Sequence, residues 1–132
     1  MNVQQVVPFL RVSNIERSLR FYESLGFTKT LQWIDDGKLR WCSLDLGGAS
    51  VMLQEFATGV GGAGISLCLI CEDAVALYRE LTARGVACSE PEVGNGMWVT
   101  TVEDPDGYRL DFESNTDAPE DTKLFDEVKP LT

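Results

Sequence analysis

The sequence contains no histidine, which excludes imidazole as a general base, as a metal ligand and as a member of a catalytic triad. Any chemistry would have to use carboxylates, thiols, hydroxyls, lysine, backbone groups or a cofactor. Basic residues are scarce, since 11 lysines and arginines stand against 21 acidic residues and give a net charge of −10. Phosphate binding needs a basic surface, so the balance argues against nucleic acids and anionic membranes as partners. The charge is explained by solubility alone, and its functional interpretation is an acidic groove for a cationic ligand.

Long apolar runs are also absent. No stretch approaches the roughly 18 apolar residues of a membrane span, and residues 1–5 lack the basic and apolar regions of a secretory signal peptide. A cytoplasmic protein is therefore expected. The 132 residues suit a single domain that buries its own core.

Cysteine is limited to four positions, at Cys42, Cys68, Cys71 and Cys88. Without a secretory signal these are expected to be reduced thiols. Cys68 and Cys71 have CxxC spacing, but they lie in an apolar run typical of a strand, and no second pair completes a zinc site. A structural role is therefore favoured over a redox role. The start of a helix after Cys71 is expected to lower the pKa of that thiol.

Hydrophobic periodicity predicts the order strand, helix, strand, strand, strand in each half of the chain. In the first half the expected strands cover 6–12, 27–34, 39–46 and 49–56. The first helix is expected to begin with a capping box at Ser13–Glu16 and to end at Gly26. A glycine-rich linker follows over 57–64. It lacks the Lys-Ser/Thr of a phosphate-binding loop.

The second half repeats this order. Strands are expected over 65–71, 86–89, 97–103 and 108–114, with a tight turn at 104–107. The second helix begins at Glu72-Asp73 and ends at Gly85. The remaining segment, 116–132, is acidic and contains prolines, and it is expected to be loosely held.

The two halves superpose at a single offset of 59 positions, which places Gly26 on Gly85 and Leu53 on Phe112. A constant offset predicts a tandem duplication within one domain, with modules at about 6–56 and 65–115. The expected fold class is α+β. Tandem βαβββ repeats form curved mixed sheets around a cleft, with the helices on the outer face. The sequence leaves open whether the modules pair within one chain or across a dimer.

Two segments carry a family resemblance. Leu10–Phe27, LRVSNIERSLRFYESLGF, and Glu103–Phe112, EDPDGYRLDF, resemble the opening and the C-terminal signature of the glyoxalase / bleomycin-resistance / extradiol-dioxygenase superfamily, also called vicinal oxygen chelate proteins. In its metal-dependent members the ion is held by the first and last strands of each module. The resemblance assigns these four positions to Val7, Met52, Ser66 and Asp111.

Only Asp111 among these four residues is a competent ligand for a hard divalent ion, which prefers several oxygens or imidazoles. Gln54 and Glu55 lie close to the Met52 position, and a small shift of register would bring an unexpected oxygen ligand. Even then the usual ligand count would not be reached. No metal and no other cofactor is therefore expected.

Strand alternation predicts which side chains line the cleft. They combine aromatic, polar and charged groups, and the expected ligand-binding residues are Phe9, Arg11, Trp41, Met52, Gln54, Ser66, Arg109, Asp111 and Glu113. For Arg109 and Asp111 a structural pair across strands is favoured over a direct role in binding. The tryptophans could equally serve as half-buried strand residues or dimer contacts.

Three functions are compatible with these residues. The first is metal-free binding and sequestration of a small molecule, such as a cationic drug, by a homodimer like those of the bleomycin-resistance branch. The second is a lyase, isomerase or dioxygenase of the superfamily with an altered metal site and a carboxylate base such as Asp111 or Glu113. The third is an interaction module that docks a partner through a sheet edge or the tail.

Overall fold

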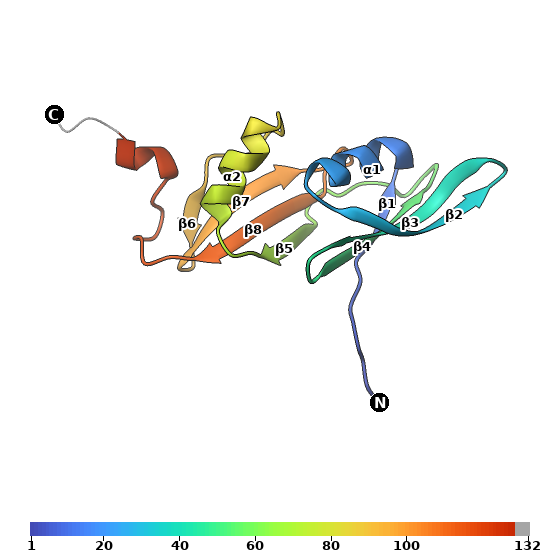
Figure 1. Ribbon diagram of the computed structural model, residues 1–132, viewed down its shortest axis with the longest axis horizontal. Coiled ribbons are helices and arrows are strands. Elements are labelled where there is room, and N and C mark those ends of the chain that lie inside the picture. The colour runs from blue at the N-terminus through green and yellow to red at the C-terminus, as the bar shows by residue number, and fades with distance from the viewer. Residues whose placement is uncertain (129–132) are drawn as a thin grey trace. The chain divides into compact units, whose positions relative to one another are not determined.

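The computed structural model describes residues 1–128, which form the expected order of elements twice (Figure 1). The first half contains β1 (Phe9–Val12), α1 (Ile15–Ser24), β2 (Thr28–Asp35), β3 (Lys38–Leu46) and β4 (Ala49–Glu55). The second half contains β5 (Ser66–Ile70), α2 (Ala74–Ala83), β6 (Glu92–Gly94), β7 (Met97–Glu103), β8 (Arg109–Asn115) and the 3-10 helix η1 (Leu124–Val128). Residues 129–132, the end of the acidic tail, lie outside the described residues. Within 1–128, neither helix has the length and apolar character needed to cross a membrane.

Each half builds one four-stranded mixed sheet. The strand orders are β1-β4-β3-β2 and β5-β8-β7-β6, with the first pair of each sheet parallel and the others antiparallel. The tandem βαβββ fold is thus confirmed. The register repeats the sequence offset, because Phe9 lies opposite Met52 and Cys68 lies opposite Asp111.

The contacts divide the chain into two compact units. The first unit comprises residues 1–62 together with 104–107, and the second comprises 63–103 and the residues from 108 onward. The turn between β7 and β8 therefore belongs to the first unit, although both strands belong to the second. This insertion is the main departure from a simple division between the two halves.

Helix α1 covers one face of the first sheet. Its buried side chains include Ile15, Leu19 and Tyr22. The predicted capping box at Ser13 is wrong, because Asn14 is the N-cap and its side chain accepts a hydrogen bond from the Arg17 amide at 3.1 Å. The predicted stop is correct, since Gly26 follows the helix with φ of +109°.

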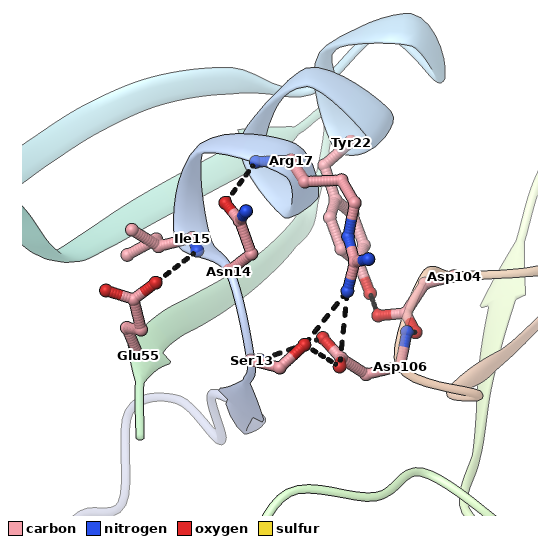
Figure 2. Close-up of polar contacts among 8 residues, drawn as sticks. All are labelled: Ser13, Asn14, Ile15, Arg17, Tyr22, Glu55, Asp104 and Asp106. Carbon is pink, nitrogen blue, oxygen red and sulfur yellow. Dashed lines mark hydrogen bonds and ion pairs between the residues drawn. The ribbon is translucent and has the colours of Figure 1, made fainter. Parts of the chain in front are cut away.

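Ser13 is instead used to hold the inserted turn (Figure 2). Its hydroxyl donates to Asp106 Oδ1 at 2.6 Å and its amide donates to Asp106 Oδ2 at 3.2 Å. Arg17 Nη2 lies 3.7 Å from Asp106 Oδ1. Deeper in the first unit, the buried Tyr22 hydroxyl donates to Asp104 Oδ2 at 2.8 Å. Both carboxylates of the turn, Asp104 and Asp106, are thus bonded to residues at or near α1.

The predicted strand at 86–89 is wrong, and β6 lies further along the chain. The Val86 amide donates to Leu81 O and completes the end of α2 instead of joining a sheet, and Pro91 has no amide hydrogen to offer. Asn95 and Gly96, both with positive φ, form the two-residue turn between β6 and β7. This Asn-Gly pair is a strong hairpin signal in the sequence.

The expectation of a loosely held tail is also wrong for residues 116–128. Val93 donates to Thr122 O at 2.8 Å and accepts from the Asp121 amide at 2.9 Å, so the segment extends the edge of the second sheet. Leu124 is buried and its amide donates to Pro91 O. Apolar burial and backbone pairing therefore hold this segment, despite its acidic composition.

Removing the hydroxyl of Tyr22 should destabilise the protein. The Tyr22→Phe variant leaves the buried Asp104 carboxylate without this donor, and hydrogen bonds to charged groups contribute about 1.5–3 kcal/mol. We expect a loss of that size in the free energy of unfolding, measured by urea denaturation. Tyr78→Phe is the control, since Tyr78 is half-buried and its ring packs on Phe125, a contact that this substitution keeps. Equal stability of both variants would contradict the role given to the Tyr22 hydroxyl.

Two buried serines should respond to alanine in opposite directions. Ser18 on α1 is fully buried, and its hydroxyl is the only buried side-chain polar atom in the described residues that lacks a hydrogen-bond partner. Ser114 is also buried, but its hydroxyl accepts from the Ala74 amide at 2.8 Å. Ser18→Ala should increase the free energy of unfolding by about 1 kcal/mol and so raise the melting temperature. Ser114→Ala should decrease it by about 1 kcal/mol and lower the melting temperature. Shifts of the same sign in thermal unfolding would refute the assignment.

Candidate functional site

The face of the first sheet opposite α1 carries two rows of four side chains across the strands. The first row consists of Trp33, Trp41, Gln54 and Arg11, and the second consists of Leu31, Ser43, Met52 and Phe9. We call these eight residues the aromatic face. Between them along the strands lie buried residues that pack toward α1, such as Leu10 and Leu53. All five ligand-binding residues predicted in this half therefore share one face.

Arg11 is fixed at one end of the aromatic face. Its guanidinium carbon lies 3.9 Å from the centroid of the Phe56 ring, and the rings of Phe9 and Phe56 meet edge to face at 6.4 Å. Gly59, with φ of +71°, lies beside the end of this side chain, and a Cβ there would lie 2.6 Å from Arg11 Nη1, so the guanidinium would have to shift. A substitution at Gly59 would also be strained by its positive φ.

The second sheet presents a polar face opposite α2. We define the polar face as Ser66 and Cys68 on β5, Val99 and Thr101 on β7, and Arg109, Asp111 and Glu113 on β8. The alternate residues Leu110 and Phe112 are buried toward α2, as predicted. The four predicted site residues of this half therefore lie together, with Ser66 directly opposite Arg109.

The carboxylate of Asp111 is the most fully bonded group on the polar face. Asp111 Oδ1 accepts from Arg109 Nε at 2.8 Å and from Thr101 Oγ1 at 2.6 Å. The predicted pair of Arg109 and Asp111 therefore exists, but it runs along one strand and not across strands. The partner across the sheet is Thr101.

The thiols are protonated groups. Cys68 Sγ donates to Glu113 Oε2 at 2.6 Å, and this bond together with burial raises the pKa of Cys68 to about 11. Burial raises the pKa of Cys42 to about 11 and also raises the pKa of Cys71. The expectation of a lowered pKa at Cys71 is wrong, because desolvation outweighs the hydrogen bond from the Asp73 backbone. All four cysteines are free.

A cavity of about 380 Å³ opens beside Arg109 and Thr101. Its remaining charged side chains are three carboxylates, Glu90, Glu92 and Asp121. The sequence interpretation missed these residues, because it placed β6 too early and treated the tail as loose. The Asn95-Gly96 hairpin signal could have placed Glu92 on a strand beside β7.

The side chains at the superfamily's metal positions do not fit a divalent ion. Val7 precedes β1, Met52 offers a thioether, Ser66 offers a neutral hydroxyl, and Asp111 is already bound by a guanidinium. Glu55, the alternative ligand, accepts from the Ile15 amide at 3.3 Å and so serves the start of α1 (Figure 2). Among the side chains that the structure describes, those of residues 1–126, no group of three or more Cys, Asp and Glu residues is arranged to hold a metal.

Comparison with solved structures shows a shared fold. A bleomycin-binding protein complexed with bleomycin is 24% identical, with a TM-score of 0.69 over 86% of this chain and 100% of that chain. A bleomycin resistance determinant encoded on the transposon Tn5 is also 24% identical, with a TM-score of 0.70 over 86% of this chain and 98% of that chain. TioX from Micromonospora sp. ML1 is 21% identical, with a TM-score of 0.69 over 86% of this chain and 100% of that chain.

No curated protein sequence matches the chain significantly. The Glyoxalase/Bleomycin resistance protein/Dioxygenase superfamily, however, matches residues 3–112, which include both βαβββ modules. The match spans most of the chain and agrees with the resemblance of its two signature segments. The chain therefore belongs to the Glyoxalase/Bleomycin resistance protein/Dioxygenase superfamily.

Proposed function

We propose that this protein binds and sequesters a cationic, partly aromatic small molecule without using a metal. The observation that carries the proposal is the chemistry of the two helix-free faces. The aromatic face supplies indole, phenyl and thioether groups, and the polar face supplies carboxylates. A cytoplasmic location is part of the proposal.

The aromatic face suits flat, weakly polar groups. Trp33 and Trp41 lie opposite each other on neighbouring strands, and Met52 lies opposite Phe9. Indole rings bind aromatic groups by offset stacking and bind cations over their faces. Large exposed apolar patches on soluble proteins commonly mark binding surfaces. Phe9 is 48% exposed and Trp33 is 51% exposed, so both rings are accessible to a ligand.

The polar face supports the positive charge proposed for the ligand. Three carboxylates line the cavity beside Arg109, and the charge of that arginine is already offset by Asp111. Glu113 is bonded by a thiol that is neutral at physiological pH, so this bond does not offset the charge of the carboxylate. The local charge and the net charge of −10 have the same sign.

The bleomycin complex of a structural relative supports the choice of a drug-like ligand. Bleomycin is therefore the probe we choose for a direct test. Because the donors at the metal positions do not fit an ion, binding should persist in the presence of a chelator. Calorimetric titration with metal-free bleomycin in EDTA tests this, and binding that requires added metal would refute the proposal.

Substitutions at the two faces should weaken bleomycin binding in different ways. Asp111→Asn should cost about 1.5–3 kcal/mol, the contribution of a hydrogen bond to a charged group. Trp41→Ala should also weaken binding, because it removes the indole ring on which an aromatic group stacks. Both effects are measured by calorimetry.

The matched control is Asp117→Asn, which makes the same change of charge at an exposed position outside both faces. It should bind bleomycin as tightly as the original protein. Unchanged affinity in both Asp111→Asn and Trp41→Ala would move the binding site elsewhere. Asp111 would then be a structural partner of Arg109 and Thr101 alone.

A homodimer is the proposed assembly. All eight residues of the edge strand β2 are exposed, including Leu31 at 62% and Ile34 at 53%. A second copy would cover this apolar edge, which otherwise invites nonspecific pairing. Light scattering should give twice the chain mass of 14.6 kDa, and Ile34→Lys should shift the equilibrium toward monomer. A monomer at all concentrations would contradict this part of the proposal.

A further inference from the structure

A second cavity lies on the opposite side of the second sheet from the polar face. It has a volume of about 440 Å³, within the range of small-molecule sites. Trp98 and Ser114 lie on neighbouring strands at its base, and the first turns of α2 contribute Val75 and Arg79. The segment after β8 completes it with Leu124. We call it the α2 cavity.

The walls of the α2 cavity are held by specific contacts. Ala74, at the start of α2, donates to the Ser114 hydroxyl at 2.8 Å and accepts from the Thr100 hydroxyl at 2.7 Å. The C-terminal segment is held against the helix by an edge contact between Tyr78 and Phe125, whose ring centroids are 6.2 Å apart. Figure 1 shows α2 and the red C-terminal helix on the same side of this sheet. The cavity is thus bounded by ordered elements on each side.

The internal duplication provides a comparison within the chain. At the offset of 59 positions, Ala74 and Ser114 correspond to Ile15 and Glu55. The same contact exists in the first unit, where the Ile15 amide donates to Glu55 Oε1 at 3.3 Å. Both side chains are larger there, and the first half has no counterpart of the Leu124 segment. The smaller side chains of Ala74 and Ser114, together with the Leu124 segment, therefore distinguish the start of α2 from the start of α1.

The charged groups of the α2 cavity have opposite signs and are available to a ligand. Among residues 1–126, whose side chains the structure describes, neither Arg79 nor Glu72 makes an ion pair or a side-chain hydrogen bond. The neighbouring Asp73 carboxylate is already used, because it accepts from the Ala76 amide as the N-cap of α2. The cavity therefore offers one guanidinium and one carboxylate beside an indole ring.

We propose that the α2 cavity binds a small zwitterionic aromatic molecule of the amino-acid type. Its ring packs on Trp98 and Leu124, its carboxylate pairs with Arg79, and its ammonium group pairs with Glu72. A guanidinium binds a carboxylate through two parallel hydrogen bonds, which an ammonium group on the protein would not provide. This site is independent of the binding function proposed for the helix-free faces.

The test uses three probes with the same ring and different charges. These are L-phenylalanine, phenethylamine, which lacks the carboxylate, and 3-phenylpropionate, which lacks the ammonium group. Binding is followed on the full chain by the NMR signal of the Trp98 indole N–H, assigned through Trp98→Phe. We expect L-phenylalanine to shift this signal, and each single-charge probe to bind at least about tenfold more weakly.

Variants of the charged residues locate the contacts. Arg79→Gln should reduce the affinity for L-phenylalanine by about tenfold or more and leave the affinity for phenethylamine unchanged. Glu72→Gln should also reduce the affinity for L-phenylalanine by about tenfold or more, and it should leave the affinity for 3-phenylpropionate unchanged. Arg20→Gln is the matched control, because Arg20 is the counterpart of Arg79 on α1 at the same offset. It should not affect binding.

Four outcomes would overturn the inference. They are no shift of the Trp98 signal with L-phenylalanine, equal binding of phenethylamine, equal binding of 3-phenylpropionate, and undiminished binding in Arg79→Gln. Equal binding of phenethylamine would indicate a cation site governed by Glu72. Arg79 is exposed, so its substitution does not disturb the core, and unfolding measurements on each variant verify this.

Discussion

The buried bond between Tyr22 and Asp104 is the constraint on which the first unit depends. Its acceptor comes from a turn whose two strands belong to the other unit. A carboxylate and a phenol hydroxyl placed in a core cost free energy unless each has a partner. Asp104 also accepts from the Asp106 amide at 2.8 Å, and the Asp106 carboxylate is bonded by Ser13. Both carboxylates of the turn are therefore bonded to residues of the first unit.

The two units share one backbone plan but carry different side chains on the faces that no helix covers. Phe9 and Met52 correspond to Cys68 and Asp111, so a pair of apolar side chains in one sheet is a thiol and a carboxylate in the other. The cores differ as well, because buried Ile15 and Tyr22 of α1 correspond to buried Ala74 and Leu81 of α2. On the faces that no helix covers, the same register carries an aromatic surface in one unit and a polar surface in the other.

Much of the fold could be predicted from the sequence, because local signals and the repeat agreed. The glycine stops at Gly26 and Gly85 and the alternation along β8 were read correctly. Failures occurred where a distant partner decided the outcome. Ser13 is a competent cap by composition, but Asp106 takes its hydroxyl. The acidic segment after β8 is ordered by Leu124 and by pairing with β6, and neither contact has a local signature. The same tertiary contacts bring Asp121 to the cavity beside Arg109 and Thr101.

The inserted turn also affects the order in which the chain can mature. Tyr22 and Asp104 are separated by 82 positions, so the acceptor is synthesised long after the helix that needs it. During translation the first sheet can form early, but its core cannot be satisfied until the second hairpin has emerged. Contacts between such distant positions close late, because the intervening loop must be ordered first. The core of the first module is therefore completed only after the hairpin of β7 and β8 has been synthesised.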